Sequence, residues 1–251
     1  MDTQTGEREH QPDWRLHATG TIAKPVVIPW SGQLVTPGTT FKVVTTASLP
    51  SNVEVTVSLP NATALFFNIA HRSYVQAREI ADRHDLHKSS RRKRKATMPE
   101  HDAFAYFELM LESVVAAHTA IEAYANEMVP ADFKYEYRKP GAKIIQMLAK
   151  SEIERQISLC EKLASVLPIA HAVAKPTNTR GWSDYKALKK VRDRIIHMKA
   201  VDRKSSGPGM DTIWHTLLAT RSPPALAKPV LEYFAERCNP KPGWYSHLPK
   251  E

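Results

Sequence analysis

The sequence predicts a mainly α-helical protein with a small β-strand unit near its N-terminus. From Asn61 onward, apolar residues recur at helical spacing over most of the chain. Before that point, the sequence is rich in Val, Ile and Thr, which favour strands. We therefore expect four parts, which are a disordered arm at 1–17, a small β unit at 18–60, a helical domain at 61–238 and an irregular tail at 239–251.

Three segments of the β unit are typical of strands, at 19–30, 41–47 and 53–59. The last two flank the turn-like residues 49–52. Apolar and polar residues alternate strictly over 53–59, so we expect one buried face and one face in water. A small sheet or hairpin follows from this pattern.

The helical domain should contain two long helices, at about 62–85 and 100–128, and a third at 151–174 that kinks at Pro168. A fourth should open at Ser183, a residue type that caps helix N-termini, and carry a basic face. Short helices are expected at 210–219 and 224–237. In the second helix, one stripe should be buried: Phe104, Phe107, Leu111, Val114, Val115, Ala125 and Val129.

Three polar residues fall on or beside that apolar stripe. His118, Glu122 and Asn126 follow one another at intervals of four, so they should stack as a ladder on one side of the helix. A carboxylate on such a face needs a partner, because an unpaired buried charge is costly. The ladder either supports a functional site or forms a structural network that fixes helix packing, and both interpretations stay open.

Composition favours a polyanionic partner or simple solubility. The chain has 251 residues, with 35 Lys and Arg against 26 Asp and Glu, and a formal net charge of +9. A run of five basic residues at 91–95 could contact phosphates, or it could be a solvated loop.

The two cysteines and the N-terminal sequence predict a cytoplasmic protein. Cys160 and Cys238 are far apart and lack Cys or His neighbours at metal-ligand spacing, so we expect free thiols, no disulfide and no bound metal. The N-terminus is polar and no apolar run approaches about 18 residues, so neither a signal peptide nor a membrane span is expected.

The most informative segment is the string Val-Arg-Asp-Arg-Ile-Ile-His at 191–197. It places Arg192 and His197 in an R-x4-H frame, with Asp193 directly after the arginine. A histidine exchanges protons near neutrality, and an arginine holds phosphate oxygens with a planar fork of donors. Together they could catalyse phosphodiester transfer through acid–base chemistry and charge stabilisation, without a metal or another cofactor.

This string, together with the preceding helix at 118–128, resembles the HEPN superfamily, in which a helix with an embedded polar residue precedes one ending in R-x4-H. The resemblance covers roughly 62–237. It implies a homodimer of helical bundles whose two motifs form one RNA-cleaving site, as in toxins and phage-defence proteins, with an antitoxin or effector as a possible partner protein. His197 and Arg192 would then be catalytic and Asp193 would position the site.

The resemblance also implies roles for the neighbouring residues. His118, Glu122 and Asn126 would support the site, and four basic residues would contact RNA: Lys189, Lys190, Arg194 and Lys199. The alternative is a non-catalytic HEPN-like dimerising scaffold or nucleic-acid-binding module, in which the motif only packs.

One geometric point qualifies the motif. Five residues of ideal helix turn through about 500°, so Arg192 and His197 would lie about 140° apart around the axis. Either the helix loosens near His197, or the arginine reaches round, or a second subunit completes the site.

Overall fold

The structure is a computed structural model, and it describes residues 13–29, 31–88, 95–138, 141, 144–205, 207, 210–238 and 241–249. Most of the expected disordered arm, residues 1–12, lies outside the described residues. So do residues 91–94 of the basic run.

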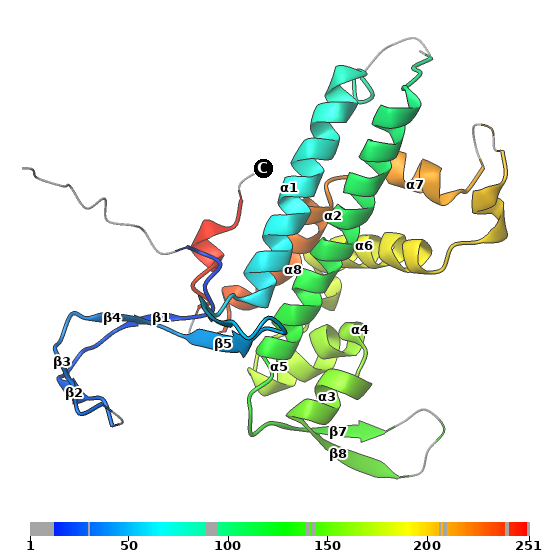
Figure 1. Cartoon of the computed structure of the whole chain (residues 1–251). Coiled ribbons are helices and arrows are strands. Elements are labelled where there is room, and N and C mark those ends of the chain that lie inside the picture. Colours follow the sequence, from blue (N-terminus) through cyan, green and yellow to red (C-terminus); the bar gives the residue numbers. More distant parts are fainter. Residues whose placement is uncertain are drawn as a thin grey trace, which may run out of the picture.

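Two long helices form the centre of the helical body. Helices α1 (Ala62–Arg83) and α2 (Glu100–Glu127) lie side by side and run antiparallel, as Figure 1 shows. Helix α2 also packs against α6 (Arg180–Ile196), α7 (Ile213–Ala219) and α8 (Pro223–Ala235). The side chains between these helices are almost fully buried, and they form one continuous core: Phe67, Met110, Ile121, Tyr124, Tyr185, Leu188 and Phe234.

Most of the stripe expected on helix α2 is confirmed, since Val114, Ala125 and Val129 are buried and Phe107 and Leu111 pack against the core. The prediction was wrong for Phe104, which is 62 % exposed, and for Val115, which is 38 % exposed. It also missed Tyr106 and Met110, which are buried because the neighbouring helices cover a broader face than one stripe. By length and composition α2 could cross a membrane, but half of its most apolar stretch is buried inside the protein, as in a core helix.

The expected helix at 151–174 is not continuous. It consists of α3 (Lys150–Gln156), α4 (Leu159–Glu161), a π-helical turn (Lys162–Val166) and α5 (Leu167–Ala170). Ile157 is extended, and the Ser158 hydroxyl accepts a hydrogen bond of 3.2 Å from the backbone N–H of Glu161, so a new helix starts there. Pro168 lies in the first turn of α5, where proline is tolerated.

Helix α6 also begins earlier than expected. Its N-cap is Thr179, whose hydroxyl accepts from the backbone N–H of Trp182 at 3.2 Å, and not Ser183. The prediction missed this cap because Gly181 disfavours a helix interior. Here Gly181 is needed for packing, since a Cβ at this position would lie 3.1 Å from Pro229 of α8.

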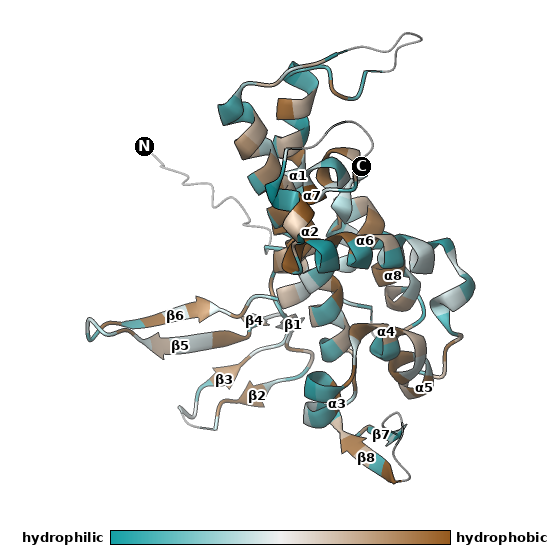
Figure 2. Ribbon diagram, turned by 90° about the vertical axis from the view of Figure 1, so that its right-hand side faces the viewer, coloured by the Kyte–Doolittle hydropathy of each residue, from teal (hydrophilic) through white to brown (hydrophobic). Residues whose placement is uncertain are grey.

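The fold class is mixed α and β, and the expected mainly α class was wrong. The described residues contain four two-stranded antiparallel sheets. Three of them form an N-terminal arm: β1 (Thr19–Thr21) with β4 (Thr40–Lys42), β2 (Val26–Val27) with β3 (Leu34–Val35), and β5 (Val44–Ser48) with β6 (Glu54–Ser58). Figure 2 shows β2–β3 and β5–β6 standing away from the helices.

The fourth sheet lies inside the part of the chain that was expected to be helical. Strands β7 (Lys134–Arg138) and β8 (Ile145–Ala149) pair as a hairpin directly after α2. Tyr135 and Tyr137 point towards the core and alternate with exposed charged residues. This period of two, in aromatic residues that favour strands, overrides the helical pattern on either side.

Both ends of the described chain pack on the body more closely than the sequence suggests. Trp14 packs against the core and Leu16 forms a β-bridge with Pro60. In the expected irregular tail, residues 245–247 form a 3-10 turn, and the ring of Trp244, 1 % exposed, lies edge-on to Tyr124 at 5.6 Å.

Candidate functional site

The R-x4-H string occupies the last two turns of α6. The helix ends at Ile196, and His197 has φ −114° and ψ 62°, outside the helical range. The helix therefore ends at the motif histidine, which is the first of the three arrangements that the spacing left open. The His197 side chain is exposed to solvent.

Asp193 forms ion pairs with two cations of the same helix. Its carboxylate accepts hydrogen bonds from Lys189, one turn earlier, and from Arg192 Nη1 at 2.9 Å. Burial raises the pKa of Asp193, but the two cationic partners outweigh it and lower the pKa overall. The cluster of Lys189, Arg192 and Asp193 thus carries one net positive charge, and the arginine is held in place.

His118 of α2 lies close to this cluster. It is 2 % exposed, and its ring stacks on that of Tyr185 with centroids 6.4 Å apart. The pKa of His118 is lowered to about 4, mainly by burial and also by the positive charges of Arg192 and Lys189, which outweigh the opposing effect of Asp193. Its Nε2 atom has no hydrogen-bond partner within the described part of the chain. His118 is therefore neutral near pH 7.

The other two ladder residues meet a buried lysine that the sequence reasoning missed. Lys162, in the π-helical turn, is 1 % exposed and donates from Nζ to Asn126 Oδ1 at 2.7 Å and to the carbonyl oxygen of Glu154 at 2.8 Å. Burial lowers its pKa, whereas the charges of Glu122 and Glu154 raise it. Glu122 itself is half-buried. A lysine inside the apolar run at 159–167 was the available signal.

Arg194 has a structural partner. Its guanidinium forms two hydrogen bonds of 2.5 Å with the carboxylate of Asp202, which also accepts from the backbone N–H groups of Lys199 and Ile213. These donors hold the pKa of Asp202 well below its usual range, although burial opposes them. Arg194 therefore anchors the segment after α6 and has little capacity left for a phosphate.

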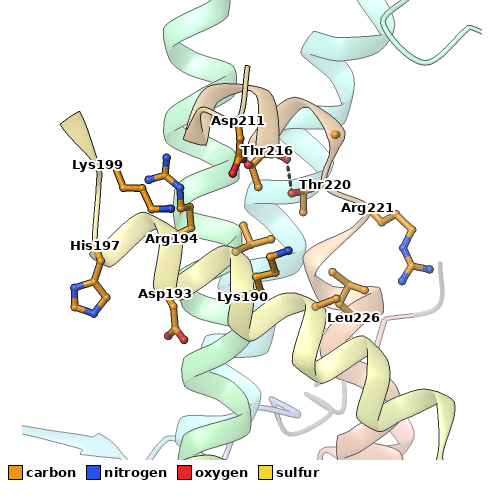
Figure 3. Close-up of a pocket in the computed structure, with 13 residues that line it drawn as sticks. Lys190, Asp193, Arg194, His197, Lys199, Asp211, Thr216, Thr220, Arg221 and Leu226 are labelled. Carbon is orange, nitrogen blue, oxygen red and sulfur yellow. Dashed lines mark hydrogen bonds between the residues drawn. The ribbon is translucent and has the colours of Figure 1, made fainter. Parts of the chain in front are cut away.

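A cavity of about 740 Å³ lies between the second half of α6 and the α7–α8 connection. Its lining includes residues of α6 and the segment after it, which are Lys190, Val191, Asp193, Arg194, His197 and Lys199. Residues of the 211–226 segment complete it, among them Asp211, Thr216, Arg221 and Leu226. Figure 3 shows Arg194 and Lys199 on the side of Asp211, whereas the side chains of Asp193 and His197 point to the opposite side of α6.

The structure thus sorts the expected site residues into three groups. Asp193 and His197 share one side of α6, with Arg192 and Lys189 bound to Asp193 and His118 close by. Glu122 and Asn126 belong to a separate cluster around Lys162. Of the basic residues, Lys190 and Lys199 are exposed at the cavity, and no ion pair involves either side chain within the described ranges.

Among the residues that the structure describes, no group of three or more His, Cys, Asp or Glu side chains is placed to hold a metal ion. Cys160 and Cys238 are free thiols, and Cys160 Sγ lies 3.2 Å from the Tyr185 hydroxyl. No protein-family model, curated protein or solved structure matches the chain. The resemblance to HEPN proteins therefore rests on the motif string and its helix alone.

Proposed function

We propose that the chain is a metal-independent endoribonuclease that cleaves RNA through its 2′-hydroxyl, using the chemistry that the R-x4-H motif provides in HEPN ribonucleases. The proposal rests on the side of α6 that Asp193 and His197 share. There an exposed histidine at the helix end lies one turn from an arginine–aspartate–lysine cluster with a net positive charge.

In the proposed reaction, His197 accepts the proton of the 2′-hydroxyl as that oxygen attacks the adjacent phosphorus. The bond from phosphorus to the 5′-oxygen breaks, and this leaving oxygen takes up a proton, so that a 2′,3′-cyclic phosphate and a 5′-hydroxyl remain. Arg192 stabilises the negative charge that develops on the phosphoryl oxygens. Asp193 orients Arg192 through their hydrogen bond of 2.9 Å.

The second copy of a homodimer would supply a second His197 and Arg192 to the same cleft, so that one histidine acts as base and the other as acid. The flanking RNA would lie on the cavity side of α6, where the exposed Lys190 and Lys199 have no carboxylate partner in the described structure. Phosphate contacts of this kind weaken steeply with salt.

The test is cleavage of labelled single-stranded and hairpin RNA by purified protein in excess EDTA. We expect fragments that end in a cyclic phosphate, and no cleavage of a substrate whose scissile nucleotide lacks the 2′-hydroxyl. His197→Ala should abolish cleavage, and Arg192→Ala should reduce it by about 10²–10³-fold, as for loss of one donor to a transition-state anion. Both changes are at partly or fully exposed side chains, so the fold should persist.

Arg180→Ala is the matched control, because it removes one positive charge from the first turn of α6, where the side chain is 86 % exposed. It should retain full activity. RNA retention on filters, measured beside cleavage, separates the alternatives. Salt-sensitive binding without cleavage by the wild type would support a nucleic-acid-binding module instead, and equal cleavage by wild type and both motif variants would refute the assigned residues.

A further inference from the structure

The two faces of the hairpin formed by β5 and β6 differ in polarity. The register pairs Val44 with Ser58, Thr45 with Val57 and Ala47 with Val55, so odd-numbered residues share one face and even-numbered residues the other. Backbone hydrogen bonds continue this register to Leu59–Val43 and Leu49–Val53. The odd-numbered side, the apolar hairpin face, consists of Val43, Thr45, Ala47, Leu49, Val53, Val55, Val57 and Leu59.

The opposite face is mostly polar. It carries Thr46 and Thr56, whose hydroxyls are hydrogen-bonded to each other at 2.8 Å, together with Ser48, Glu54 and Ser58. The hairpin is therefore amphipathic, as the alternation over 53–59 predicts. Burial of one face, however, does not occur within a single chain.

Side chains of the apolar hairpin face are open to solvent. Val57 is 49 % exposed, Val53 50 % and Leu49 43 %, and Figure 2 shows the hairpin projecting from the helical body. A two-stranded hairpin is at best marginally stable in water by itself, and large exposed apolar patches mark interaction surfaces. This face needs a cover that one copy of the chain does not provide.

We propose that the cover is a second copy of this chain, whose arm packs against the same face. The charge distribution supports this choice. Two molecules of net charge +9 repel each other, and residues 18–59 contain only three charged residues, Lys24, Lys42 and Glu54. The apolar hairpin face has none. A two-fold interface uses the same patch on both partners, so a patch without charges can face its own copy without like-charge repulsion.

The size of the patch indicates how much of the arm takes part. Between Val26 and Val57 there are nine exposed large apolar residues besides Val44, which lies on the opposite face of the hairpin. At roughly half exposure each, they present on the order of 700 Å² of surface, close to the about 800 Å² per partner of a stable interface. The hairpin alone offers much less. A matching arm, which also brings the β1–β4 and β2–β3 ribbons, can cover this length.

This inference does not depend on the proposed ribonuclease activity, and its test reads mass only. Sedimentation of the purified full chain over a concentration series should show a monomer–dimer equilibrium. The double variant Val55→Thr/Val57→Thr keeps shape and strand preference but makes the apolar hairpin face polar, and it should raise the dimer Kd at least tenfold. Val44→Thr is the matched control, since Val44 is 55 % exposed in the same hairpin but on the opposite face, and it should change the Kd less than twofold.

Disulfide trapping gives an independent readout. In a series of single variants on the apolar hairpin face, Thr45→Cys, Ala47→Cys and Val55→Cys, the one closest to the two-fold axis should form a covalent dimer on mild oxidation, whereas Thr46→Cys on the opposite face should not. A wild-type chain that stays monomeric at the highest concentrations would overturn the proposal. So would a dimer whose Kd responds equally to Val44→Thr and to the double variant, or a purified monomer that binds a different protein through this face.

Discussion

Replacing His118 should remove a specific part of the pH dependence of stability. The imidazole is 2 % exposed, and burial together with Arg192 and Lys189 lowers its pKa from the usual 6.5 to about 4. The unfolded chain therefore takes up a proton at His118 near pH 6.5, whereas the folded protein resists protonation down to about pH 4. Because the unfolded state binds more protons in this window, the free energy of unfolding falls as the pH is lowered through it.

The magnitude follows from the shift. Each pH unit in the window lowers the free energy of unfolding by at most about 1.4 kcal/mol. Between about pH 7.5 and about pH 5, His118 should therefore account for a loss of about 2 kcal/mol. His118→Gln keeps a polar side chain but cannot be protonated, so the variant should lack this loss. All other titrating groups are shared, and the difference between the two proteins isolates His118.

Urea unfolding followed by circular dichroism at both pH values gives the required free energies. The same substitution at a histidine exposed to solvent, His87→Gln, is the matched control for the change of side chain. If wild type and His118→Gln lose stability in parallel as the pH falls, His118 is protonated in the folded state and its burial beside the Arg192 cluster is wrong.

Two further predictions concern the packing that positions α6. Arg194→Met should lower the melting temperature by several degrees, because it leaves the Asp202 carboxylate, 1 % exposed, without its cation. Arg203→Met, at an exposed side chain, should change the melting temperature little. Equal melting temperatures of the two variants would contradict the anchoring role of Arg194. Gly181→Val should lower the free energy of unfolding by about 1–3 kcal/mol, since its Cβ would meet the Pro229 backbone at 3.1 Å, while Gly207→Val, with no atom within 4 Å, is the control in the same assay.

The two long helices were predictable because each satisfies a local pattern over many turns. The observed α1 and α2 begin at the predicted residues, 62 and 100, and α2 ends within one residue of the prediction. Boundaries failed where a single cap decided them. Thr179 caps α6 and Ser158 starts α4, and neither outcome can be separated by pattern from nearby Ser and Thr residues without knowing what packs on the following turn.

The β structure was underpredicted for a related reason. Five-residue strands such as β7 and β8 give only two or three repeats of the alternating pattern, too few to outweigh a long helical neighbourhood. The arm shows the opposite case. Its alternation was recognised over 53–59, but the inference that one face is buried assumed that the covering surface lies in the same chain.

The candidate site shows what spacing alone can reveal. In an ideal helix, the R-x4-H spacing places the two side chains on different sides of the axis. Because α6 ends at Ile196, the direction of the His197 side chain is no longer set by the helix. The partnership of Arg194 with Asp202 cannot be read from the string, because Asp202 lies in a separate turn. Of the two arginines in the string, Arg194 is held by Asp202, whereas Arg192 lies in a partly exposed cluster beside the buried His118 and is the one that we expect to meet a phosphate. A phosphate-binding role for this helix therefore predicts sensitivity to Arg192 before Arg194, the reverse of what helical spacing to His197 favours.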